Sequence, residues 1–345
     1  MKLTKIALGV ALAAGTVAAQ AADILWFPHV VNSGTVTTVL TVIDTAGTDY
    51  TGVAKPHHMH YVYKAKDKAD SVEAFNLLPC EENDTEYPFS TYDVQTFDLS
   101  GVLSSNKAGV LFEEAAGPLN NDWTRFDYMR AAIAADSARK KGINVEGTRG
   151  YFVVEDATAT NDGDLQGYAM IFDYQSGSAW GYPGEAFNAP VYDHTPQEFA
   201  VHLMPPAETI TRLMVTPFGA AADMVPAGIG WQNAQATTVT PVALNGSLAV
   251  ADRDENLDSG TYASTVVCVG TVDVLQGISN QKVVENGGWM KMTTAAPAAP
   301  YNAAPYTGLA NAVVYQLDFG GKGATNNQFN GVSYPGTWNN VTIRQ

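Results

Sequence analysis

The amino-acid sequence predicts an all-β protein in which antiparallel sheets form a sandwich or a jelly-roll-like fold. Short segments rich in β-branched and aromatic residues recur along the chain, and clusters of Gly, Asn, Asp and Pro separate them. The clearest example is TVTTVLTVI at residues 35–43, which follows the turn sequence Asn32-Ser33-Gly34. Short strands with turn residues at frequent intervals are typical of β-sandwiches.

Residues 1–21 have the composition of a secretory signal peptide. Two lysines precede an apolar run, which ends in the small-residue sequence Ala-Gln-Ala at 19–21. No later segment has the roughly 18 uninterrupted apolar residues that a membrane-spanning helix needs. We therefore expect a secreted protein of the bacterial periplasm, cell surface or extracellular space, with a mature chain of residues 22–345.

The remaining strands are expected in order along this mature chain, each between turn-forming residues. Their expected ranges are 24–31, 57–64, 93–99, 150–155, 167–174, 209–216, 237–244, 264–275, 313–319 and 341–344.

One helical insertion is expected at about residues 121–141. Asn121 or Asp122 can cap its N-terminus, and Gly142 can end it. Its apolar residues recur at helical spacing, at Trp123, Phe126, Met129 and Ile133.

The mature chain is expected to form a single β-sandwich-type unit. A sub-boundary near residues 195–207, where prolines gather, is the alternative. The Ala/Pro/Tyr-rich segment 293–308 is expected to be a surface loop, because proline cannot donate a hydrogen bond within a central strand.

The composition limits the partners that the protein can have. The formal net charge of −16 argues against nucleic acid as a partner. Hydrophobic residues make up 46% of the chain and charged residues 16%, which indicates a folded protein and not a disordered acidic segment.

Two cysteines, Cys80 and Cys268, are expected to form a disulfide bond, because export would place them in an oxidising compartment. The bridge would close a long loop, and the chain-entropy model gives it up to about 5 kcal/mol of stabilisation.

The segment KPHHMHYVY at residues 55–63 contains three of the six histidines. Alternate residues of a strand share a face, so His58 and His60 would lie on one face and His57 on the other. His29 is the expected third ligand, and three imidazoles suit copper or zinc. The alternative is a strand at a sheet edge with solvated histidines.

The segment DRDENLDSG at residues 252–260 is a candidate calcium loop. An EF-hand loop would have a glycine where this chain has Leu257 and an acid where it has Ala263, so an acidic β-turn is the alternative. The expected calcium ligands alternate along the segment: Asp252, Asp254, Asn256 and Asp258.

The chain contains neither G-x-S-x-G nor H-E-x-x-H, and no catalytic residue is assigned. Aromatic residues in Pro- and Gly-rich segments instead suit contacts with a surface protein or a glycan. These residues are Tyr301, Tyr306, Tyr334 and Trp338.

Several segments resemble a family of exported, uncharacterised bacterial surface proteins. They are ILWFPHVV at the start of the mature chain, HYVYK with Cys80 downstream, STYDVQTFDLSG, GYAMIFDYQSGSAWGY and VVCVGTVDV. This resemblance implies a secreted β-sandwich. The chain is also similar to the surface copper-binding proteins of methane-oxidising bacteria, through Trp26, His29, His58 and His60, although its Trp-to-His spacing departs from their pattern. That likeness implies a surface copper site.

The sequence therefore predicts an exported, non-enzymatic structural or interaction protein, for which self-assembly is one mode of action. A surface copper- or zinc-binding protein is the first alternative. A carbohydrate-binding or carbohydrate-active module is the second.

Overall fold

The computed structural model divides the chain into two compact units. Unit 1 comprises residues 1–61 and 82–189, and unit 2 comprises residues 62–81 and 190–345. The structure describes residues 24–32, 36–45, 55–65, 68–89, 94–99, 110–112, 147–156, 165–173, 178–187, 198–203, 209–217, 234–259, 262–274, 278, 281–310, 312–320 and 341–343.

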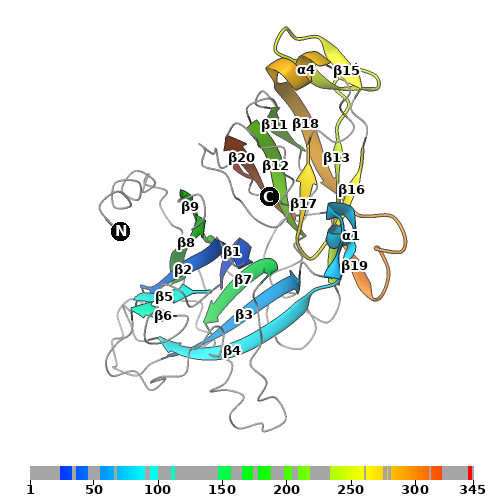
Figure 1. Cartoon of the computed structure of the whole chain (residues 1–345). Coiled ribbons are helices and arrows are strands. Elements are labelled where there is room, and N and C mark those ends of the chain that lie inside the picture. Colours follow the sequence, from blue (N-terminus) through cyan, green and yellow to red (C-terminus); the bar gives the residue numbers. More distant parts are fainter. Residues whose placement is uncertain are drawn as a thin grey trace. The chain divides into compact units, whose positions relative to one another are not determined.

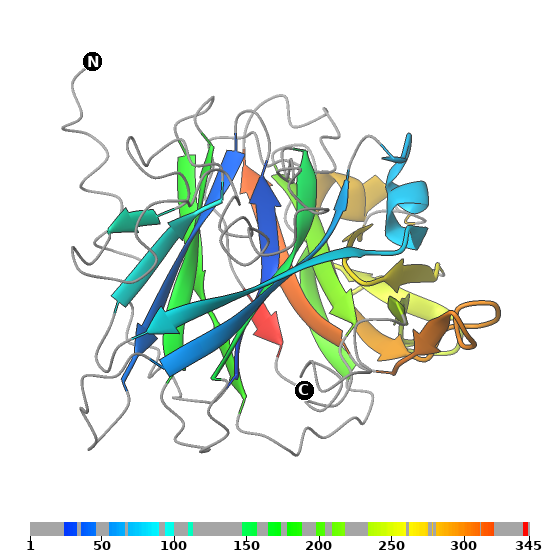
Figure 2. The same ribbon diagram turned by 90° about the horizontal axis from the view of Figure 1, so that it is seen from below.

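Unit 1 contains two five-stranded sheets (Figures 1 and 2). The first has the order β10-β1-β7-β3-β4, and the second the order β6-β5-β2-β8-β9. Their strands are β1 (Ile24–Asn32), β2 (Val36–Asp44), β3 (Lys55–Ala65), β4 (Glu81–Phe89), β5 (Val94–Asp98), β6 (Val110–Phe112), β7 (Thr148–Asp156), β8 (Leu165–Asp173), β9 (Ser178–Pro183) and β10 (Glu185–Phe187).

The two sheets of unit 1 pack face to face through β1 and β8. Leu25 and Phe27 are buried, and both lie against Gly167 on β8. A Cβ atom at Gly167 would lie 2.2 Å from the carbonyl oxygen of Thr41, so this position accepts only glycine without a backbone shift. The same Cβ atom would lie 2.9 Å from the side chain of Leu25 in the other sheet, so the contact between the sheets also depends on glycine at this position.

Unit 2 also has two sheets. The seven-stranded sheet has the order β15-β14-β18-β13-β16, with β11 beside β18 and β19 beside β13, and the four-stranded sheet has the order β17-β12-β20-β21. Their strands are β11 (Glu198–Leu203), β12 (Thr209–Pro217), β13 (Ala234–Pro241), β14 (Leu248–Asp252), β15 (Leu257–Ser259), β16 (Ser264–Val267), β17 (Gly270–Asp273), β18 (Gly288–Ala295), β19 (Tyr306–Gly308), β20 (Ala312–Gly320) and β21 (Val341–Ile343).

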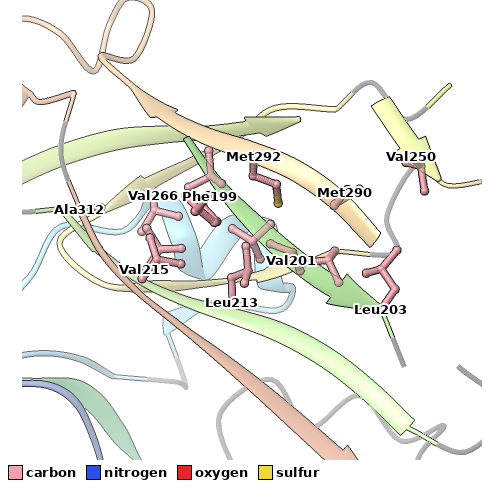
Figure 3. Close-up of a cluster of buried hydrophobic side chains, with 14 of the residues drawn as sticks. Phe199, Val201, Leu203, Leu213, Val215, Val250, Val266, Met290, Met292 and Ala312 are labelled. Carbon is pink, nitrogen blue, oxygen red and sulfur yellow. The ribbon is translucent and has the colours of Figure 1, made fainter. Parts of the chain in front are cut away.

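The core of unit 2 lies between these two sheets (Figure 3). On β11 burial alternates along the strand, so that Phe199, Val201 and Leu203 point inward. They meet Leu213 and Val215 of β12 from the opposite sheet. Burying a side chain of this size stabilises the fold by about 1.5–3 kcal/mol, which makes this cluster the main source of stability in the unit.

Residues 62–81 leave unit 1 within β3 and belong to unit 2. They contain the short helix α1 (Val72–Leu77), whose N-terminus is capped by the hydroxyl of Ser71, which accepts from the backbone N–H of Ala74. The buried side chain of Asn76 then binds the backbone of Thr271 on β17 at both ends of its amide. It donates to the carbonyl oxygen at 2.8 Å and accepts from the N–H at 3.0 Å.

The all-β prediction is confirmed, and among strand pairs of described register only β13 and β19 run parallel. The strand expected at 264–275 is instead two strands, β16 and β17, which belong to different sheets of unit 2. Two short helices were not expected, α1 and α4 (Gln281–Asn286). The helix expected at 121–141 and the signal peptide lie outside the described residues.

The sequence led us to expect a single unit in the mature chain, with a sub-boundary near residues 195–207 as the alternative. The structure divides the chain after residues 61, 81 and 189. The first two divisions enclose an excursion of only twenty residues, residues 62–81, and no change of composition accompanies it.

Replacing Asn76 by alanine should destabilise unit 2 by about 2–4 kcal/mol, because two hydrogen bonds to the buried backbone of Thr271 are lost. Urea unfolding measures this loss. The matched control is Glu73→Gln on the exposed side of the same helix, which should change the free energy of unfolding by less than about 0.5 kcal/mol. Equal effects from both variants would contradict the anchoring role of Asn76.

Candidate functional site

The histidine-rich segment forms β3, an inner strand of its sheet between β7 and β4. His57 and His60 are both buried, with 0% and 2% of their surface exposed. The interpretation as an edge strand with solvated histidines is therefore wrong, because β3 is an inner strand and its buried His57 and His60 point to opposite faces. The side chain of His58 lies outside the described residues.

His57 reaches from β3 to the other sheet of unit 1. Its Nε2 atom lies 3.6 Å from Oδ2 of Asp44 on β2, and both side chains are buried. The contact therefore joins the two sheets through a polar pair.

His29 lies on β1 at an irregularity where the pairing with β7 shifts between Phe27 and Val30. Pro28 stands inside this shift and cannot donate to the neighbouring strand. The hydroxyl of Tyr182 takes the place of a strand partner here. It accepts a hydrogen bond from the N–H of His29 at 3.1 Å and donates one to the carbonyl oxygen of His29.

The ring of His29 faces a buried cation. Nδ1 of His29 lies 3.5 Å from a guanidinium nitrogen of Arg149, and Arg149 is 1% exposed. Burial and, secondarily, the charge of Arg149 hold the pKa of His29 well below its ordinary value of 6.5. The ring is therefore neutral at pH 7.

The structure does not place His29 on a strand next to His58 and His60. β7 lies between β1 and β3, so the first strand and the histidine-rich strand are not neighbours. A metal ion on the His29 ring would also meet the charge of Arg149. Over the described residues, no three His, Cys, Asp or Glu side chains lie close enough to hold a metal ion.

The candidate calcium loop joins β14 to β15. The carboxylate of Asp252 accepts from the N–H of Asp254 at 2.8 Å, and from the N–H and side-chain amide of Asn256 at 2.9 and 3.0 Å. Hydrogen bonds from Asn256 are the main cause that lowers the pKa of Asp252. The acidic-turn interpretation accounts for these contacts, because the carboxylate closes the turn itself.

The two cysteines meet in unit 2 although they are far apart in sequence. Cys80 packs against a small cluster that contains Cys268, and the two thiols are hydrogen-bonded. No disulfide bond joins them in the structure. The expected disulfide bond is therefore not found, and both cysteines are free thiols that lie together in unit 2.

Two of the expected contact aromatics have a different environment. Tyr301, in the loop between β18 and β19, and Tyr306, the first residue of β19, stack edge to face with ring centroids 5.0 Å apart and pack against the cysteine cluster. Tyr334 and Trp338 lie outside the described residues. Among the residues that the structure describes, the large exposed apolar side chains are instead Val94, Tyr168 and Trp289.

No known family profile matches the chain, and comparisons with curated proteins and with solved structures find no significant similarity. Within the described part of the chain, no helix is long and apolar enough to cross a membrane.

The low pKa of His29 leads to a pH dependence of stability. In the unfolded chain His29 binds a proton near pH 6.5, whereas in the folded chain it stays neutral at that pH. The free energy of unfolding should therefore fall as the pH drops below 6.5. The contribution of His29 approaches about 1.4 kcal/mol per pH unit. Urea unfolding between pH 7.5 and 5.5 should show a shallower pH dependence for His29→Gln than for wild type, whereas His202→Gln, at an exposed histidine, should keep the wild-type dependence.

Proposed function

We propose that the protein is an exported, non-enzymatic protein that makes structural or interaction contacts at the cell surface or in the extracellular space. The observation that carries this proposal is the solvent-facing side of β11 and β18 in unit 2. It presents an exposed tryptophan among polar side chains, directly over the apolar core of the unit.

This outer face is built by the alternation of both strands. His202 of β11 stands opposite Trp289 of β18, and both are exposed. Trp289 keeps 39% of its surface exposed. An ion pair between Lys291 and Glu198 extends the same face along the two strands. Tryptophan gives more binding energy than other residues at many interfaces, because it buries a large area and has a polar tip.

The opposite side of these strands explains why the face is held in place. Met290 and Met292 are fully buried, and they pack with Val201 between the sheets (Figure 3). The positions of Trp289 and Lys291 are therefore fixed by their inward-pointing neighbours on the same strand. A fixed aromatic ring loses little conformational entropy when it binds a partner.

The proposed partner is a surface protein, a second copy of the chain, or a glycan. An exposed tryptophan ring can stack on the apolar face of a sugar, and this observation favours the carbohydrate-binding module as the second candidate function. The copper or zinc alternative rests on His58 and His60, because β7 separates the strand of His29 from β3 and the charge of Arg149 lies beside the His29 ring. The proposed export also places Cys80 and Cys268 where a disulfide bond can form.

Trp289→Ala should weaken binding of the mature chain to washed cells of the producing bacterium by about tenfold, the loss expected when a central interface aromatic is removed. A cosedimentation assay with labelled protein measures this change. Tyr168→Ala is the matched control, because Tyr168 is an exposed aromatic in unit 1. Undiminished binding by Trp289→Ala would refute the outer face as the contact surface. Competition by purified cell polysaccharide would select the glycan alternative.

Export has its own test. The mature protein should be recovered outside the cytoplasm with Ala22 as its first residue, because the sequence at 19–21 has the small residues that signal peptidase requires. N-terminal sequencing of the protein from culture medium, periplasm and cytoplasm measures this. An intact Met1 on the protein found outside the cytoplasm would contradict the signal-peptide assignment.

A further inference from the structure

The cysteine pair of unit 2 lies where two distant segments of the chain meet. Cys80 ends the excursion of residues 62–81, immediately before β4. Cys268 lies between β16 and β17, at the corner where the chain passes from one sheet of unit 2 to the other. A covalent bond between the two thiols would therefore fasten the excursion to this corner.

The backbone at Cys268 has an unusual conformation. Its φ angle is 57°, in the left-handed region that residues other than glycine rarely adopt and that costs them about 1–2 kcal/mol. The N–H of Cys268 donates to the carbonyl oxygen of Gln235 at 2.7 Å, which holds the corner in this conformation. Strain of this kind is concentrated at functional positions.

The Cys268 thiol is surrounded by groups that stabilise a negative sulfur. It accepts hydrogen bonds from the thiol of Cys80 and from the backbone N–H groups of Cys80 and Gln235, and the ammonium of Lys64 is near. Burial by itself raises the pKa of Cys268. The hydrogen bond from Cys80, the charge of Lys64 and the two backbone hydrogen bonds outweigh burial and leave the pKa below its usual value.

Lys64 is held in place by helix α1. Its ammonium donates to the carbonyl oxygens of Phe75 at 2.9 Å and Asn76 at 3.1 Å, and it lies 5.2 Å from the centre of the Phe75 ring. Only 1% of Lys64 is exposed. A lysine buried to this degree favours negative charge nearby, and a thiolate formed at Cys268 would provide it.

We propose that Cys80 and Cys268 form a reversible dithiol–disulfide site that reacts with thiol-derived disulfides. Its closure fastens residues 62–81 to the rest of unit 2. Cys80 is the partly exposed thiol, and Cys268 is buried beneath it. The oxidant therefore reacts with Cys80 first, and the buried thiol of Cys268 then forms the disulfide bond with Cys80. This site does not depend on the proposed surface role.

The reaction proceeds in two exchanges. The Cys268 thiolate takes the proton of Cys80, and the Cys80 sulfur attacks the oxidant R–S–S–R, which gives Cys80–S–S–R and the thiolate RS⁻. This RS⁻ takes the proton from Cys268. The Cys268 sulfur then attacks the Cys80 sulfur and displaces a second RS⁻, which takes a proton from water. Two electrons pass from the two cysteine sulfurs to the oxidant, and two RSH molecules leave.

The test treats the full mature chain with oxidised glutathione and follows the masses of the intact protein and of its alkylated peptides. Wild type should lose both thiols together and carry no glutathione at completion. Cys268→Ser should stop as a glutathione adduct on Cys80, and Cys80→Ser should react at least about tenfold more slowly than wild type, because the remaining thiol is buried.

Lys64 provides the charge test. Lys64→Met should slow closure of the disulfide by roughly tenfold, because loss of the nearby ammonium raises the pKa of Cys268 and reduces its share of thiolate. Lys64→Arg keeps the charge and should close faster than Lys64→Met. Circular dichroism checks that each variant is folded, and the cysteine variants decide the proposal if Lys64→Met does not fold.

Fastening of the excursion is measured by trypsin cleavage after Lys68, whose side chain is 52% exposed. Cleavage should be slower in oxidised than in reduced wild type, and reducing agent should restore the faster rate. Separate glutathione adducts on both cysteines of wild type, absence of any reaction, or equal cleavage of the two forms would each overturn the proposal.

Discussion

The structure of unit 2 depends on the contacts that hold residues 62–81 against the rest of the unit. The amide of Asn76 replaces a strand neighbour for Thr271, because it satisfies both the N–H and the carbonyl group of that residue. Lys64 satisfies carbonyl groups at the end of helix α1 in the same segment. The excursion also buries Phe75, so buried polar and apolar contacts together define its position.

Two buried histidines of unit 1 have charged side chains as neighbours. His57 faces a carboxylate of the opposite sheet, whereas His29 faces a guanidinium in its own sheet. The buried histidines therefore belong to the polar part of the core, and a cluster of imidazoles in the sequence does not by itself make a metal site.

Unit 2 separates its two chemically interesting regions. The outer face around Trp289 is exposed and polar, which suits reversible contact with a partner. The cysteine pair is covered by Tyr301 and Tyr306 and lies near a buried ammonium, which suits thiol chemistry. The strained corner at Cys268 connects the two sheets, so oxidation would act on the part of the fold where the chain changes direction between them.

The sequence by itself determined the fold class and most long strands, because β-branched runs such as residues 35–43 and the turn residues beside them act locally. It also drew attention to the two cysteines, which the structure places together as free thiols and not as the expected disulfide bond. It could not show that β7 separates β1 from β3, that Cys268 divides one apolar run into two strands, or that Lys64 is buried beside a thiol. These features depend on pairing between distant segments, and the energy of such contacts appears only when the tertiary structure brings their partners together.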